Sequence, residues 1–252
     1  MGRYTVYAKI QRVGAKKRVK PSDIEKLYKE QAQEYSHFAD SSFSWLYLEK
    51  PVLDKVLAPF TNKHPKILDA GCGSGRVLRY LLSRNINSND IVGVDICEDM
   101  LAIARKNAPN VTTVRSDLVT ISLKSHFDLI LCTHVLHYLD SNDYKRALRN
   151  LYKLLNPDGT LLLVLTHPVR TTRHNLENYF LRDWIVDHTP WGTNSPLFLR
   201  PISDMVNEVI RTGFTVKSLE EPSVPAGAEK SDPHNYAKYS CCPSRIAVIA
   251  IK

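Results

Sequence analysis

The stretch Ile67-Leu-Asp69-Ala-Gly71-Cys-Gly73-Ser-Gly75-Arg76 decides how this chain folds. A short apolar run ends here in a loop with a glycine at every second position, and an amphipathic segment follows the loop. Glycines at a turn from strand to helix let the backbone pass close to a ligand and point amide N–H groups at it. The stretch therefore predicts the ligand-binding first turn of an α/β sheet.

The spacing of the glycines distinguishes this loop from two other nucleotide-binding loops. A dinucleotide-binding turn reads G-x-G-x-x-G, and a phosphate-binding loop reads G-x-x-x-x-G-K-[ST]. Here the pattern is G-x-G-x-G, with Asp69 before it and no lysine after it. A carboxylate would repel a pyrophosphate but would attract an ammonium group. We therefore expect a ligand that is cationic near Asp69.

Apolar runs and amphipathic segments alternate along the rest of the chain. The runs predict seven strands, over residues 66–70, 91–95, 111–115, 127–132, 160–166, 214–219 and 245–251. Helical spacing predicts helices over 23–38, 45–60, 76–84, 99–107, 143–155 and 202–210. The first is expected to start at the capping box Ser22-Asp-Ile-Glu25. The predicted fold is α/β, with N-terminal helices and a doubly wound, Rossmann-like seven-stranded sheet.

Two connections are too long for ordinary loops of such a fold. Residues 168–200 and 220–243 far exceed the usual connection of about 2–6 residues. The first is rich in aromatic residues, which a disordered loop would lack. We expect both segments to be lids. The first should be an inserted aromatic lid whose substrate-contacting residues are Tyr179, Phe180, Trp184 and Trp191.

The net charge of +8 is concentrated at the N-terminus. Residues 1–20 hold seven of the 34 basic residues and no acidic one, so the remaining chain has 27 basic residues against 26 acidic ones. We divide the chain into a basic arm, residues 1–21, and one domain, residues 22–252. Such an arm is typically solvated, but it could also bind the phosphates of a nucleic acid.

Composition narrows the class of protein. The 252 residues are 43% hydrophobic, and no window reaches the roughly 18 apolar residues of a membrane span. The five cysteines are odd in number and show no C-x-x-C spacing, so neither a disulfide framework nor a zinc site is indicated. We expect a cytoplasmic protein that does not contact a membrane. The sequence leaves its oligomeric state open.

Polar residues follow the second and third predicted strands. Asp95 ends the second strand 24 residues after Gly71, where an acid can accept both hydroxyls of a ribose. Ser116-Asp117-Leu118 follows the third strand, where it can read an adenine edge. With the glycine loop and the later Leu-Asn-Pro-Asp-Gly-Thr-Leu turn, this order resembles the class I S-adenosylmethionine-dependent methyltransferases. The resemblance covers residues 22–252 and is tightest over 66–166.

The resemblance implies S-adenosylmethionine as cofactor and gives roles to several residues. Gly71 and Gly73 would lie under its methionine part, and Asp95 would hold its ribose. The residues implied around adenine are Ile96, Met100, Asp117 and Leu118, and Thr133 would also contact the cofactor. Tyr28 and Tyr35 match tyrosines that cap the cofactor in many relatives, although core aromatics on an amphipathic face give the same pattern.

The end of the fourth strand departs from several subfamilies. It reads Cys132-Thr133-His134-Val135 in place of the Asn/Asp-Pro-Pro-Tyr/Phe or Pro-Cys motifs of enzymes that methylate bases or glutamine. The acidic cluster with which catechol-type enzymes hold magnesium has no counterpart either. We therefore expect a metal-independent enzyme of the small-molecule type that methylates an O, N or C atom.

Three histidines are candidates for a general base. His134 and His137 follow the fourth strand and His167 ends the fifth, at the edge where ligands bind in such sheets. A pKa near 6.5 suits proton removal at neutral pH, but structural hydrogen bonds would explain each histidine equally well. Two other functions stay open: an RNA methyltransferase that uses the basic arm, and a cofactor-binding protein that catalyses or regulates a different reaction.

Overall fold

The computed structural model describes residues 11–13, 19–61, 63–189 and 191–252. Most of the predicted basic arm lies outside these ranges. Its described part pairs with the predicted aromatic lid, because Arg12 forms an antiparallel bridge with Ile185. The division into an arm and one domain stays a prediction.

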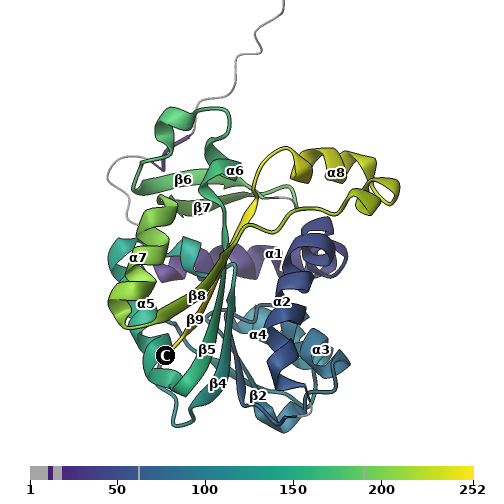
Figure 1. Ribbon diagram of the computed structural model, residues 1–252, viewed down its shortest axis with the longest axis vertical. Coiled ribbons are helices and arrows are strands. Elements are labelled where there is room, and N and C mark those ends of the chain that lie inside the picture. Colours follow the sequence, from purple (N-terminus) through teal and green to yellow (C-terminus); the bar gives the residue numbers. More distant parts are fainter. Residues whose placement is uncertain (1–10, 14–18, 62, 190) are drawn as a thin grey trace, which may run out of the picture.

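A seven-stranded sheet forms the centre of the molecule, in the order β3-β2-β1-β4-β5-β9-β8 (Figure 1). The strands are β1 (Ile67–Ala70), β2 (Ile91–Asp95), β3 (Thr112–Arg115), β4 (Phe127–Thr133), β5 (Leu155–Thr166), β8 (Thr215–Glu220) and β9 (Arg245–Ile251). Neighbours among the first five are parallel, and β9 is antiparallel to both β5 and β8. The predicted doubly wound α/β fold is confirmed.

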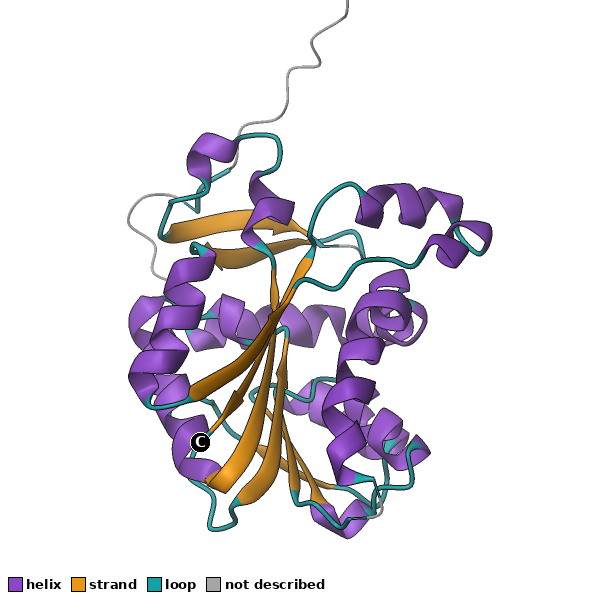
Figure 2. Ribbon diagram, in the orientation of Figure 1, coloured by secondary structure: helices purple, strands orange, loops and turns teal. Residues whose placement is uncertain are grey.

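Helices cover both faces of this sheet (Figure 2). The main ones are α1 (Pro21–Ser41), α2 (Lys50–Leu57), α3 (Arg76–Ser83), α4 (Glu98–Asn107), α5 (Ser141–Leu154) and α7 (Ile202–Thr212). Side chains of a strand point alternately to its two faces. Along β4, Ile130 and Cys132 accordingly pack into the core under α5 and α7, whereas Leu129 and Leu131 pack into the core under α2 and α3.

The structure differs from the predicted elements in two places. The helix predicted over 45–60 consists of a π-helical turn (Trp45–Glu49), α2 and a 3₁₀ turn (Ala58–Phe60). Pro51 has no N–H for the helical ladder, which accounts for the break near the start of α2. The turn predicted at residues 156–159 lies within β5 as a bulge, with Asp158 at a φ of 60°.

The two long connections are folded elements instead of open loops. Residues 168–200 contain α6 (Pro168–Thr172), a 3₁₀ turn (Leu176–Asn178) and an antiparallel hairpin of β6 (Asp183–His188) and β7 (Asn194–Leu199). Residues 220–243 contain a 3₁₀ turn (Ala226–Lys230) and α8 (Pro233–Ser240). Figure 1 shows the hairpin and α8 at the same end of the sheet, beyond the carboxyl ends of its parallel strands. They are therefore placed to cover a site there.

Candidate active site

The topology places a crevice between the carboxyl ends of β1 and β4. These strands are neighbours, but α3 follows β1 on one face of the sheet and α5 follows β4 on the other. In open α/β sheets ligands bind at such a switch point, outside the carboxyl ends of the strands. The glycine loop and His134 both lie there.

The glycine loop needs its glycines for steric reasons. Gly71, Gly73 and Gly75 have φ values of 89°, 52° and 84°, in the left-handed region that side chains with a Cβ rarely adopt. A Cβ on Gly71 would lie 2.0 Å from Cγ2 of Val135. The loop backbone thus passes directly against the segment that follows β4.

Asp95 joins the glycine loop to the end of β2. Its Oδ2 accepts a hydrogen bond from the amide N–H of Gly73 at 2.8 Å, and its Oδ1 accepts one from the amide N–H of Cys97 at 2.9 Å. Burial raises the pKa of Asp95, and these two hydrogen bonds oppose the rise. Each carboxylate oxygen retains a lone pair for a ligand hydroxyl.

Two adjoining hollows flank the glycine loop, and we call them together the loop cavity. Both are bordered by Gly71, Asp95 and Val135. All predicted cofactor-binding residues except Asp69 line the loop cavity: Tyr28, Tyr35, Gly71, Gly73, Asp95, Ile96, Met100, Asp117, Leu118 and Thr133. The structure therefore brings together residues that are spread over 106 positions of the sequence, from Tyr28 to Thr133.

Asp69 lies behind the glycine loop and is fully buried. Within the described part of the chain, neither of its carboxyl oxygens has a hydrogen-bond partner. Burial raises the pKa of Asp69 to about 8, and the nearby carboxylate of Asp95 adds to the rise. Asp69 is therefore mostly protonated at pH 7, and a cation arriving at the loop would favour its ionised form.

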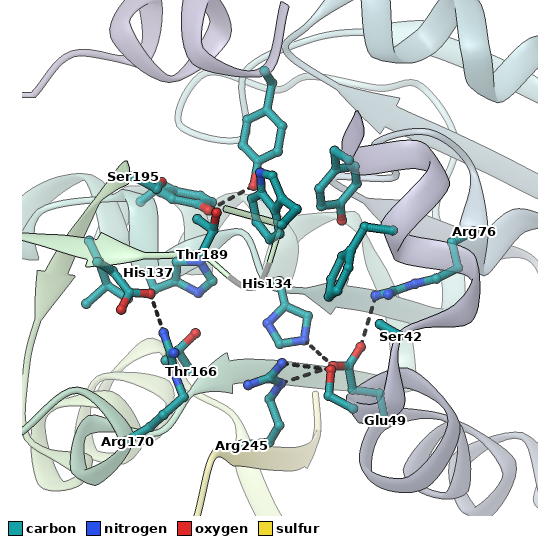
Figure 3. A pocket seen from close by; sticks show the side chains of 18 residues that line it. Ser42, Glu49, Arg76, His134, His137, Thr166, Arg170, Thr189, Ser195 and Arg245 are labelled. Carbon is teal, nitrogen blue, oxygen red and sulfur yellow. Dashed lines mark hydrogen bonds and ion pairs between the residues drawn. The ribbon is translucent and has the colours of Figure 1, made fainter. Parts of the chain in front are cut away.

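A third hollow, the polar pocket, opens next to the loop cavity (Figure 3). The two share the side chains of Tyr28, Tyr35, His134 and Tyr138. The other residues that line the polar pocket are Phe38, Ser42, Ser44, Glu49, Arg76, His137, Thr166, Arg170, Asp187, Thr189, Trp191, Ser195, Leu197 and Arg245. They come from α1 and the segment after it, the π-helical turn, the start of α3, the turn after β4, the end of β5, α6, the hairpin and the start of β9, so elements distant in sequence build this pocket.

Glu49 is the centre of a charge cluster on one side of the polar pocket (Figure 3). Its side chain is 2% exposed, and its oxygens lie 2.9 Å from Nη2 of Arg76 and 3.0 Å from both Nε of Arg245 and Nε2 of His134. Burial alone would raise the pKa of Glu49, but His134 and the two arginines outweigh it and hold the pKa well below its usual range. Glu49 is therefore ionised.

The two histidines of the pocket are buried and neutral. Burial lowers the pKa of His134 in spite of Glu49, and burial together with His134 lowers the pKa of His137 well below its usual range. His134 has a φ of 60°, and its amide N–H donates to the carbonyl of Val164 at 2.8 Å. In the described structure, Nδ1 of His137 has no hydrogen-bond partner.

Arg170 of α6 and Asp187 of β6 form an ion pair on the opposite side of the pocket. Thr166 of β5 lies beside Arg170 (Figure 3). Among the described residues, Nε of Arg170 has no hydrogen-bond partner although it is buried. The ion pair ties the hairpin to α6, the helix that follows β5.

Several residues predicted for catalysis or substrate binding lie outside the polar pocket. His167 caps α6, because its Nδ1 accepts from the amide N–H of Val169, and its Nε2 therefore donates to Oε1 of Glu221 at 2.7 Å. Trp184 is buried against Phe198 behind the pocket wall. Side chains of a strand point alternately to its two faces. Asp187 of β6 points into the pocket, so Trp184 of the same strand points away from it.

Tyr179 and Phe180 also lie outside the polar pocket, and Phe180 is 72% exposed. Of the four predicted aromatic contacts, Trp191 lines the pocket, where its Nε1 donates to Oε1 of Gln31 at 3.0 Å. Sequence reasoning missed Glu49, Arg170 and Arg245. The one signal available was a lone acid, Glu49, on the otherwise apolar buried face of residues 45–57.

The described residues offer neither a cluster that could hold a metal ion nor a membrane-spanning helix. They contain no group of three or more histidine, cysteine, aspartate or glutamate side chains that could hold a metal ion. None of the described helices is both long enough and apolar enough to cross a membrane.

Part of this chain is similar in sequence to known methyltransferases. Residues 67–159 match the model of a methyltransferase domain. An uncharacterized protein of Haemophilus influenzae is 26% identical over 76% of this chain and 81% of its own length. Malonyl-[acyl-carrier protein] O-methyltransferase of Bacillus anthracis is 30% identical over 55% of this chain, and the match spans about half, 51%, of that enzyme.

Solved structures share the fold across most of this chain. An S-adenosylmethionine-dependent methyltransferase from Mesorhizobium loti has a TM-score of 0.64 and 22% identity, over 84% of this chain and 99% of its own. The N-methyltransferase NodS from Bradyrhizobium japonicum, in complex with S-adenosyl-L-homocysteine, has a TM-score of 0.61 and 13% identity over 90% and 98%. Residues 67–159 are thus a methyltransferase domain, and the chain has the fold of S-adenosylmethionine-dependent methyltransferases.

Proposed function

We propose that this enzyme transfers a methyl group from S-adenosylmethionine to a small molecule held in the polar pocket, without a metal ion. The observation that carries the proposal is that the polar pocket and the loop cavity share one wall, made of His134 and three tyrosines. The polar pocket combines aromatic side chains with convergent polar groups, as small-molecule sites commonly do. Its two carboxylates are paired with arginines, which leaves no oxygen-rich donor set for magnesium.

The loop cavity fits the cofactor in three respects. The side-chain-free backbone of Gly71 borders both hollows, Asp95 can accept from a pair of hydroxyls, and Asp69 is a buried carboxyl without a partner in the described structure. Asp117 and Leu118 border the far end of the cavity, where adenine would lie. The bound cofactor supplies a methyl group on a positively charged sulfur.

The side chains of the polar pocket would position the acceptor and exclude water. Tyr28 and Tyr138 hydrogen-bond to each other at 2.8 Å across the boundary of the two cavities, and Trp191 packs edge-on against Tyr35. Proximity and orientation supply roughly 7–11 kcal/mol of a barrier of this kind. His137 is neutral, so it can either accept a proton from the acceptor or donate a hydrogen bond to it, whereas the N–H of neutral His134 faces Glu49.

The relatives differ in the accepting atom. The Bacillus anthracis relative is an O-methyltransferase, and NodS is an N-methyltransferase. Relatives on this fold thus act on oxygen and on nitrogen, so the accepting atom has to be inferred from the polar pocket itself.

Cofactor binding is tested with S-adenosylhomocysteine, by calorimetry and by thermal unfolding. A ligand at 100 times its Kd stabilises a fold by about 2.7 kcal/mol, which for a chain of this size raises Tm by roughly 5–10 °C. We expect this rise for the wild type and for the control Asp99→Ala, whose side chain lies outside the loop cavity. Asp95→Ala should lose most of it. Equal rises for both variants, or none for the wild type, would contradict the proposed function.

A further inference from the structure

The polar pocket carries more positive than negative charge. Three arginines line it, Arg76, Arg170 and Arg245, against two carboxylates, Glu49 and Asp187. The histidines of the pocket are neutral and add nothing to this balance. The lining side chains therefore have a net charge of +1, although the body of the chain is close to neutral.

Neither carboxylate is free to receive a cation. Glu49 is held by Arg76, Arg245 and His134, and Asp187 is held by Arg170. An ammonium group in the pocket would face three guanidinium groups with no unshared counter-charge. An amine acceptor is disfavoured for that reason.

Arg170 is arranged to receive an anion. Within the described residues its buried Nε–H has no acceptor, and an unsatisfied donor on a charged group is costly to bury. The hydroxyl group of Thr166 lines the same pocket and can also donate, whereas those of Thr189 and Ser195 already donate to the carbonyls of Thr193 and Pro196. Phe38 and Trp191 pack against each other and give the pocket an apolar part as well. The lining thus suits an anionic head group on an apolar body.

We propose that the acceptor is a carboxylic acid, bound as its carboxylate and methylated on oxygen; this rests on the proposed function. A lone pair of the carboxylate oxygen forms the new O–CH₃ bond while the S–CH₃ bond breaks, and the electron pair of that bond stays on sulfur. The charges of the carboxylate and the sulfonium cancel, so an ester and a neutral thioether result and no proton is released. His137 would then be a positioning residue that donates a hydrogen bond.

Three probes with the same body and different head groups test this assignment. They are 3-phenylpropanoate, 3-phenylpropan-1-ol and 3-phenylpropylamine, titrated calorimetrically at pH 7 into enzyme saturated with S-adenosylhomocysteine. We expect the acid to bind at least tenfold more tightly than the alcohol or the amine. Any other order, including no binding of the acid, would overturn the proposal.

Substitution of Arg170 tests which group holds the carboxylate. Arg170→Gln should weaken binding of the acid at least tenfold and leave binding of the alcohol unchanged. The matched control is Arg182→Gln. Arg182 belongs to the same insertion but lies outside the pocket, where it pairs with Asp204 of α7. This variant should bind the acid like wild type. The double variant Arg170→Gln/Asp187→Asn leaves no unpaired carboxylate. It should show the same loss as Arg170→Gln, and wild-type affinity in the double variant would contradict the role of Arg170.

The product separates failure of this inference from failure of the proposed function. Enzyme incubated with methyl-labelled cofactor and 3-phenylpropanoate should give a methyl ester, which releases labelled methanol in mild alkali. Cofactor binding with transfer only to the amine or the alcohol, in a base-stable product, would overturn the carboxylate assignment and keep the proposed function. If S-adenosylhomocysteine does not bind at all, both fall.

Discussion

The loop cavity and the polar pocket are built in different ways. The loop cavity comes mainly from backbone and apolar groups at the ends of neighbouring parallel strands, within residues 67–139 and α1. The polar pocket is held by charge pairs between distant segments, such as Glu49 with Arg245, 196 residues apart. Substitutions in the hairpin of β6 and β7 or at the start of β9 can therefore change the acceptor chemistry while the loop cavity stays the same.

The largest effect is expected at the centre of the polar pocket, in Glu49→Gln. The change leaves Arg76 and Arg245 buried without their counter-charge, and breaking a buried pair in this way costs about 3–5 kcal/mol. Denaturant unfolding at pH 7 measures the loss. The control is Glu98→Gln, whose pair with Arg105 is exposed and contributes about 0–1 kcal/mol. Equal losses in both variants would remove the distinction between a buried network and a surface pair.

In the loop cavity, Gly71→Ala should weaken cofactor binding at least 100-fold, or about 2.7 kcal/mol. The new methyl group would overlap Val135, and φ is 89° there. Gly227→Ala is the matched control, because a Cβ on Gly227 would have no neighbour within 4 Å. Calorimetry with S-adenosylhomocysteine measures both. The double variant Gly71→Ala/Val135→Ala should recover only part of the loss, since the strained φ remains; full recovery would show that the overlap alone matters.

Asp69 should couple the loop cavity to pH. Its pKa of about 8 in the folded chain is raised above the value in the unfolded chain, so the folded state binds more protons between pH 4 and 8. Asp69 therefore makes the unliganded fold less stable as pH rises through this range, and Asp69→Asn should flatten that slope. If the cofactor's ammonium group ionises Asp69, binding at pH 7 releases about one proton. Calorimetry in buffers of different ionisation enthalpy should detect that proton in wild type and not in Asp69→Asn.

The smallest effect is expected at the aromatic wall of the polar pocket. Trp191→Ala should raise KM for the acceptor several-fold and leave the affinity for S-adenosylhomocysteine unchanged, because Trp191 lines only the polar pocket. The control Phe180→Ala removes a mostly exposed aromatic of the same insertion and should change neither value. Similar changes in both constants for Trp191→Ala would mean that the two cavities are not separable.

Local patterns predicted most of the fold and of the loop cavity. The strand at residues 91–95 and the glycine loop depend on neighbours in sequence, and their bounds agree with the structure. The helix predicted to start at about Asp23, after a capping box that begins at Ser22, starts at Pro21 instead. The amide N–H of Lys20 donates to Asp23, and the fixed φ of Pro21 suits a first helical position.

The polar pocket could be predicted only in part, because its geometry depends on long-range pairing. His134 and His137 follow from the end of β4 and do line the pocket. His167 ends β5 in the same way, yet its ring turns to Glu221, 54 residues later, and a sequence pattern carries no signal for that partner. The sequence likewise does not tell which of Trp184 and Trp191 points into the pocket, because that depends on how β6 pairs with β7.

Residues 11–13 have a consequence for how shortened forms of the chain should behave. The carbonyl of Gln11 accepts from the amide N–H of Val186, and the amide N–H of Val13 donates to the carbonyl of Trp184, so this segment covers the outer edge of β6. A chain beginning at residue 20 would expose that edge, and bare strand edges pair with other molecules. A chain beginning at residue 11 would keep it covered. The chain that begins at residue 11 should therefore stay dispersed in concentrated solution. The chain that begins at residue 20 should self-associate.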